Sequence, residues 1–164
     1  MDFIVDTDVA SMLCKIGRIE LLKKIFPNSK FHITQETVKE LERAKELGFD
    51  YMGEIVHVMD LINLDEEVLK KGREISENNK RLHLTEICGI LVCRKKGNVM
   101  LTNDKAAKQF CEKHDVVWMD IVELLRFGFL KQEITKNECW EIIWEIEEKD
   151  KTRIRNAERI FEKK

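Results

Sequence analysis

Proline and glycine are scarce in this sequence, and its apolar runs are short. The 164 residues include one proline, Pro27, and seven glycines, and no Gly/Ser-rich linker or internal repeat divides them. A chain of this length without a linker is expected to form one domain that buries its own core. The longest apolar runs, such as residues 87–93, are far shorter than the roughly 20 residues that span a bilayer. The sequence therefore predicts a globular protein with no membrane partner.

Paired cysteines are also missing, and the sequence predicts no signal peptide. The five cysteines are odd in number and form no C-x-x-C pair. We therefore expect buried, reduced thiols, with neither a disulfide framework nor a zinc site. The N-terminal sequence MDFIVDTDVA has no basic segment, and it carries Asp6 and Asp8 where a signal peptide would be apolar. These features predict a cytoplasmic protein.

An excess of basic charge is absent as well. The formal net charge is −2, so any nucleic-acid binding must come from local patches. One candidate patch is residues 94–96. The other is the C-terminal stretch, whose basic residues are Lys149, Lys151, Arg153, Arg155, Arg159, Lys163 and Lys164. Acidic residues are interspersed among these, which favours the solvated face of a helix.

Short apolar strands alternate with helices along most of the chain. The predicted strands cover residues 3–5, 30–34, 99–101 and 116–118. The predicted helices cover residues 16–26, 34–47, 65–77, 86–96 and 104–113, another begins near Thr135, and residues 54–64 fit either state. Thr34 and Thr85 are expected to cap helices, and Gly97 to end one. This alternation predicts an α/β fold of three layers (α/β/α), with a central, mostly parallel sheet and extra C-terminal helices.

Four acidic residues lie where such a fold gathers its ligands. Asp6 ends the first strand and Asp104 follows the strand at 99–101, while Glu86 begins a helix. Glu40 lies on the helix after the second strand. Because ligands bind beyond the carboxyl ends of parallel strands, these four side chains can lie together in one ligand-binding site. Clustered carboxylates repel one another unless cations neutralise them, and magnesium is the usual partner. Paired ions of this kind can activate water against a phosphodiester.

Each acid also has a purely structural interpretation. Glu86 and Asp104 lie in the first turns of helices, where a carboxylate interacts favourably with the helix dipole. Glu40 shares its helix with Glu36, as on an ordinary solvated face. Only Asp6, which ends a buried strand, requires a partner on chemical grounds.

Taken in order, these motifs resemble the PIN-domain family over about residues 3 to 130. FIVDTDVASM resembles the family's first strand and aspartate, HITQETVKELERA resembles its second strand and acidic helix, and residues 82–120 resemble its later acidic segments. The resemblance implies Mg²⁺- or Mn²⁺-dependent cleavage of RNA. Its catalytic, metal-coordinating acids would be Asp6, Glu40, Glu86 and Asp104, and its supporting residues Thr7, Asp8, Thr102 and Asn103.

The same resemblance divides the chain and marks one departure. Residues 1–130 would form a PIN-like nuclease domain, and residues 131–164 a C-terminal helical extension packed on the same domain. Glu86 stands where the family more commonly has aspartate. Its longer side chain is expected to affect the catalytic rate more than metal binding.

Other functions stay open on the sequence alone. The D-T-D-V segment after the first strand also resembles the nucleophile loop of haloacid-dehalogenase-like phosphatases, with Asp6 as nucleophile, although no later D-x-x-x-D motif follows. A PIN-type fold can also serve as an RNA-binding or scaffold module with a weak metal site. A nuclease would be either a VapC-like toxin controlled by a small antitoxin protein or an RNA-processing factor. Trp140 and Trp144 either mark a surface for a homodimer or partner or, as we prefer, pack in the core.

Overall fold

The computed structural model describes residues 1–162, and a five-stranded sheet lies at its centre. Every pair of neighbouring strands is parallel, in the order β3-β2-β1-β4-β5. The strands are β1 (Phe3–Val5), β2 (Phe31–Thr34), β3 (Met59–Ile62), β4 (Val99–Leu101) and β5 (Trp118–Met119). The predicted parallel sheet is therefore confirmed.

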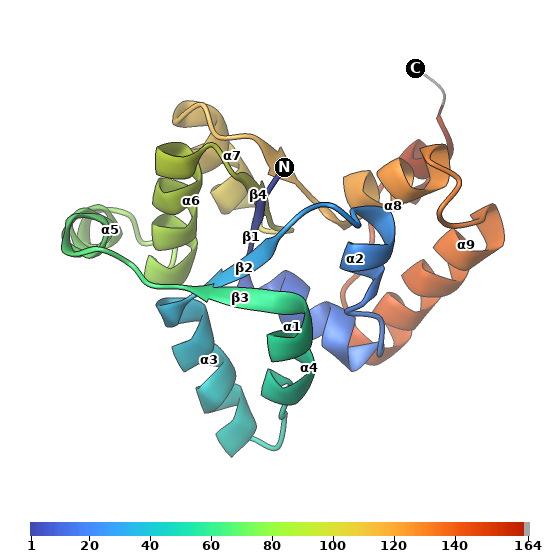
Figure 1. The fold of residues 1–164 in the computed structure, drawn as a ribbon, viewed down its shortest axis with the longest axis horizontal. Helices are drawn as coiled ribbons and strands as arrows, with labels where there is room; N and C mark the ends of the chain where they lie inside the picture. The colour runs from blue at the N-terminus through green and yellow to red at the C-terminus, as the bar shows by residue number, and fades with distance from the viewer. Residues whose placement is uncertain (163–164) are drawn as a thin grey trace.

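Helices cover both faces of this sheet, which gives the predicted three layers. Figure 1 shows α5 (Glu66–Asn78) and α6 (Leu84–Lys96) on one side of the sheet, and α2 (Leu21–Ile25), α8 (Ile121–Leu130) and α9 (Lys136–Glu145) on the other. The remaining helices are α1 (Thr7–Lys15), α3 (Gln35–Glu46), α4 (Met52–Val58) and α7 (Lys105–Lys113). Since α1, α3 and α7 each begin directly after a strand, their N-termini lie at the carboxyl end of the sheet.

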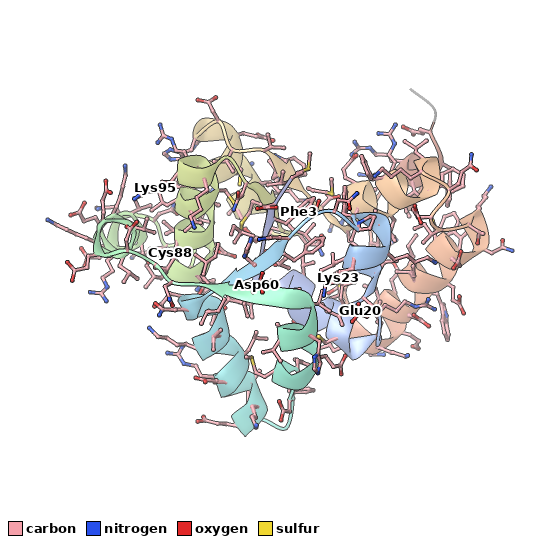
Figure 2. The ribbon with its side chains drawn as sticks, in the orientation of Figure 1. Phe3, Glu20, Lys23, Asp60, Cys88 and Lys95 are labelled. Atoms are coloured by element: carbon pink, nitrogen blue, oxygen red, sulfur yellow. The ribbon has the colours of Figure 1, made fainter. Side chains whose placement is uncertain are left out.

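Two hydrophobic clusters pack against the two faces of the sheet. Phe3 and Val5 belong to the cluster under α1, α2, α8 and α9, and Ile4 belongs to the cluster under α5, α6 and α7. This split follows from the alternation of side chains along a strand. Figure 2 labels Phe3 from the first cluster and Cys88, on α6, from the second. All five cysteines are buried and free, as predicted.

The predicted helix over residues 16–26 is right only for its second half, because the chain turns over residues 16–20. Helix α1 ends at Lys15, and Gly17 takes a φ of 69°. This left-handed conformation is one that glycine adopts without steric cost. A second, short helix, α2, begins at Leu21. The apolar spacing read as one helix thus comes from two elements and a turn.

Three other boundaries differ from the sequence prediction. The N-cap of α6 is His83 and not Thr85, so this helix begins at Leu84. Residues 54–64 contain both predicted states, since α4 ends at Val58 and β3 begins at Met59. Strand β5 covers Trp118–Met119 rather than residues 116–118. The caps expected at Thr34 and Gly97 are confirmed.

The C-terminal segment packs on the same core. After α9 the chain forms a π-helical turn, η1 (Ile146–Asp150), and a 3-10 helix, η2 (Ala157–Phe161). Ile142, Ile146 and Ile160 all belong to the cluster that contains Phe3. The division at residue 130 stays a prediction, because one core joins both parts.

Two predictions about this segment are wrong. Residues 151–154 are not helical, so the basic tail is not the face of one continuous helix, although Lys149 and Arg159 lie in the short helices η1 and η2. Trp140 and Trp144 do not pack in the core, since they are 44% and 63% exposed. Lys163 and Lys164 lie outside the described residues. Within the described part of the chain, no helix is long and apolar enough to cross a membrane.

Candidate functional site

An acidic pocket opens at the carboxyl end of the sheet, where the β1–α1 junction, helix α3 and the start of α6 converge. Its volume is about 230 Å³. Three segments of the chain contribute to it, and the residues that line it are Asp6, Thr7, Asp8, Glu40, His83, Thr85 and Glu86. The structure therefore brings three of the four predicted acids, Asp6, Glu40 and Glu86, to one pocket. Two of the predicted supporting residues, Thr7 and Asp8, line the same pocket.

Asp6 is the most buried acid of this pocket, with 4% of its surface exposed. It is the N-cap of α1, and its Oδ1 accepts a hydrogen bond from the Val9 amide at 2.8 Å. The pKa of Asp6 is raised from 3.8 to about 7, chiefly by burial and to a smaller extent by the neighbouring charges of Asp8 and Glu86. Hydrogen bonds from Thr102 and the Val9 amide act in the opposite direction. Such a carboxylate is costly to keep charged without a compensating cation.

Glu40 reaches the pocket from the first half of α3. Its Oε2 accepts a hydrogen bond from the Thr7 hydroxyl at 2.5 Å, and its Oε1 accepts one from the Thr85 hydroxyl at 2.5 Å. Glu36, the rival on the same helix, is held by Lys39 at 2.6 Å and does not line the pocket. The helix register therefore directs Glu40 inward, and three elements meet at its carboxylate.

Glu86 is the third residue of α6 and closes a capping box. Its Oε2 accepts a hydrogen bond from the His83 amide at 2.7 Å. Burial raises its pKa, and the charges of Asp104 and Asp8 add to this effect. The structural role and the pocket role therefore coincide at Glu86, since one oxygen serves the helix and the carboxyl group still lines the pocket.

Asp8 completes the acidic group on the outer side of the pocket. Burial is the main cause that raises the pKa of Asp8, and the charges of Glu40, Asp104 and Asp150 also raise it. Its carboxylate accepts no hydrogen bond and forms no ion pair within the described chain. It is therefore the pocket acid with the most freedom to meet a ligand.

Asp104 stands at the edge of this group. It does not line the pocket, but its charge acts on both Asp8 and Glu86. As the N-cap of α7, it accepts the Ala107 amide on Oδ1 at 2.7 Å. Its own amide donates to the Thr102 hydroxyl at 3.2 Å, so Thr102 links Asp104 to Asp6.

Asn103 faces away from the acids. Its Oδ1 accepts a hydrogen bond from the Ile121 amide at 3.1 Å, and its Nδ2 lies 3.7 Å from the Met12 sulfur. The side chain thus ties the end of β4 to the start of α8. Its place beside Asp104 in the sequence did not predict this direction.

Two residues of the pocket were missed as functional candidates on the sequence. Thr85 was expected only to cap a helix, and it instead donates to a carboxylate 45 positions earlier in the chain. His83 lines the pocket and supplies the amide that holds Glu86. The Thr85 contact carries no sequence signal, because it arises from packing α6 against α3, whereas the contact of His83 with Glu86 is a local capping box.

No protein-family model and no curated protein sequence matches this chain. Among solved structures, a chain of VapBC2 from Rickettsia felis, crystallised with a DNA fragment from their promoter, matches with a TM-score of 0.56 and 12% identity. This match covers 73% of the present chain and 98% of that one. PAE2754 from Pyrobaculum aerophilum matches with a TM-score of 0.52 and 14% identity, over 78% of this chain and 98% of that one. The chain has a PIN-like fold. The expected architecture is therefore confirmed at the level of the fold.

The oxygen-rich lining of this pocket suits a hard divalent cation in its chemistry. Glu86 Oε1 and Asp104 Oδ2 accept no hydrogen bond from residues 1–162, so each carboxylate keeps one oxygen available. Both oxygens of Glu40 are instead held by hydroxyls. As arranged, no three His, Cys, Asp or Glu side chains of the described residues form a metal-binding group. A cation held by three of these carboxylates would therefore require the side chains to move closer together.

Proposed function

We propose that this protein is a divalent-metal-dependent endoribonuclease that hydrolyses RNA phosphodiester bonds in the acidic pocket. The observation that carries the proposal is the convergence of Asp6, Asp8, Glu40 and Glu86 on one pocket, with the charge of Asp104 acting on two of them. The PIN-like fold supports it, because this pocket lies at the carboxyl end of the parallel sheet, where ligands bind in such folds.

Asp6, Glu86 and Asp104 would hold Mg²⁺ or Mn²⁺ through their carboxylate oxygens. When bound, such an ion stabilises negative charge on a phosphate and promotes ionisation of water. Glu40 would join them only if the hydroxyl of Thr7 or Thr85 turned away, since these hydroxyls occupy both of its oxygens. With both hydrogen bonds in place, Glu40 holds the start of α1 and the start of α6 next to each other.

Hydrolysis makes a bond between a water oxygen and phosphorus and breaks the bond between phosphorus and the leaving oxygen. A proton leaves the water, and a proton is returned to the leaving oxygen. Asp8 is suited to accept the first proton, because it is exposed and free of hydrogen-bond donors within the described chain. Asp6 is less suited to this role, since two hydrogen bonds and burial fix it.

The candidate partners are RNA as substrate and a small antitoxin protein as inhibitor. We propose the antitoxin by analogy with VapBC2, which was crystallised with a DNA fragment from its promoter. A small DNA-binding protein encoded beside this chain, and purifying with it, would favour the toxin role. Its absence would favour an RNA-processing role.

The direct test is cleavage of a single-stranded RNA in Mn²⁺, repeated in EDTA. Wild type should cleave only in Mn²⁺, and Asp6→Asn should lower the rate by about 100-fold or more. Asp60→Asn is the matched control, since Asp60 is an exposed acid on β3 that does not line the pocket (Figure 2). It should keep the wild-type rate.

Three other outcomes would replace this proposal. Cleavage that persists in EDTA and in Asp6→Asn contradicts an acidic metal site. RNA binding without cleavage or Mn²⁺ uptake favours the scaffold alternative, which the doubly held Glu40 already supports. Hydrolysis of a small phosphoester that depends on Asp6 and Asp8 favours the dehalogenase-like phosphatase.

A further inference from the structure

A second groove lies beside the acidic pocket, and the C-terminal tail forms one of its walls. Its volume is about 480 Å³. The opposite walls come from the start of α7 and from β5. The side chains that matter for its chemistry are Lys105, Lys108, Trp118, Arg153, Arg155 and Arg159. Positive charge therefore lines a groove in a chain whose net charge is −2.

Three of these cations have no carboxylate to neutralise them. Lys108 pairs with Asp120 at 2.6 Å, and Arg159 pairs with Glu123 at 3.1 Å. Lys105, Arg153 and Arg155 are exposed, and among the described residues no acidic side chain forms an ion pair with any of them. Unpaired cations that line one groove attract the phosphates of a nucleic-acid backbone.

Trp118 adds an aromatic surface to this groove. The ring is only partly buried, and Lys108 Nζ lies 5.0 Å from its centroid. Grooves for single-stranded nucleic acids combine cations that follow the backbone with aromatic rings on which bases stack. An anionic protein segment would use the cations but has no need of an aromatic ring in the groove wall. The combination therefore favours a nucleic acid strand.

The groove runs close to the acidic pocket. Asn103 lines the groove, and the next residue, Asp104, acts on the pocket acids Asp8 and Glu86. At the other end, Asp150 pairs with Lys15 of α1 at 2.6 Å, three residues before Arg153 enters the groove. The tail therefore passes from the helix that carries Asp8 directly into the basic wall.

From these contacts we infer that the groove binds the backbone of a single-stranded RNA whose cleaved phosphodiester reaches the acidic pocket. The inference rests on the proposed ribonuclease function for the choice of RNA. Arg153 and Arg155 bind phosphates, and Trp118 stacks against a base. The C-terminal segment thereby becomes part of the substrate site and not only a support for the core.

The test measures binding apart from cleavage. A fluorescent single-stranded RNA is titrated with Asp6→Asn protein in Mg²⁺, and anisotropy is followed at several salt concentrations. Adding Arg153→Ala and Arg155→Ala should weaken binding about tenfold and reduce the slope of log K against log salt by about 1.4, which corresponds to two phosphate contacts. Both arginines are exposed, so the fold should tolerate their loss.

A matched control removes the same charge from another basic groove. Lys71 and Arg94 line a separate groove between α5 and α6 and are also exposed. The double variant Lys71→Ala and Arg94→Ala should bind RNA within about twofold of its parent, because losing charge outside the site should not matter at moderate salt. Equal weakening by both double variants would overturn the inference.

Other outcomes separate this inference from the proposed function. Wild-type RNA cleavage together with unchanged binding and cleavage by the arginine variant would overturn the groove and leave the nuclease intact. RNA binding that requires Arg153 and Arg155 in a protein that never cleaves RNA would support the groove and remove the nuclease. Tighter binding of a polyglutamate peptide than of RNA, lost in the arginine variant, would assign the groove to an acidic protein segment and overturn the inference.

Discussion

Replacing Asp6 with asparagine should remove a pH dependence that the acidic pocket imposes on folding. The Asp6 carboxyl is buried beside Asp8 and Glu86, and burial raises its pKa from 3.8 to about 7. Asparagine has almost the same shape, can still accept the Val9 amide on its oxygen, and carries no charge at any pH. The variant therefore keeps the N-cap of α1 and loses only the titrating group.

The sign follows from the raised pKa. Because the folded state binds this proton more tightly than the unfolded state, protonation of Asp6 stabilises the fold. This contribution is fully present below pH 3.8 and is lost as the pH rises through about 7. One pKa unit corresponds to about 1.36 kcal/mol, so a rise of about three units makes the total loss about 4 kcal/mol.

The measurement is urea unfolding of both proteins in EDTA between pH 4 and pH 8. The free energy of unfolding of Asp6→Asn minus that of wild type should increase by about 4 kcal/mol over this range. Asp60→Asn, which removes an exposed acid from β3, should follow the wild-type curve. Parallel curves for Asp6→Asn and wild type would refute the reasoning, since they would mean that Asp6 is ionised without cost in the folded protein.

Two further substitutions test packing and the polar contacts of the pocket. A methyl group at Gly128 of α8 would lie 2.8 Å from Ile25 Cδ1, so Gly128→Ala should lower the free energy of unfolding by about 1–3 kcal/mol in urea titrations. Gly53→Ala on α4 meets no atom within 4 Å and should be stabilising by up to about 1 kcal/mol, which makes it the matched control. Thr85→Val keeps its shape and removes the hydroxyl that donates to Glu40, so it should cost about 1 kcal/mol. An unchanged unfolding midpoint for Thr85→Val would show that this hydrogen bond contributes nothing.

The fold was predictable where local and periodic signals agree. Buried apolar triplets at residues 3–5 and 99–101 form strands, and Thr34 and Gly97 begin and end the helices expected of them. The apolar spacing predicted a helix through Gly17, but a turn with a left-handed residue at Gly17 separates α1 from α2. The prediction that Trp140 and Trp144 pack in the core is wrong for another reason. Both lie on α9, and they stay 44% and 63% exposed although the Trp140 ring packs against Phe161 of η2.

The candidate site also contains residues that the sequence predicted and residues whose place depends on tertiary packing. That Asp6 and Asp104 follow strands β1 and β4 could be read from the sequence, and a parallel sheet places such positions at one edge. That Glu40 and not Glu36 turns into the pocket could not be read, because two acids on one helix differ only by their rotation about its axis. The packing of α3 against α1 and α6 settles that rotation.

By itself, the sequence determined the alternation of strands and helices, most of their caps and the acids at the strand ends. These features depend on hydrogen bonds and side-chain periodicity within a few residues. Only the tertiary structure decided that Thr7 and Thr85 hold Glu40 from 33 and 45 positions away, and that the tail carrying Arg153 and Arg155 lies beside β5. Such contacts form when distant segments pack around a common core, and no local pattern of residues encodes which of them will meet.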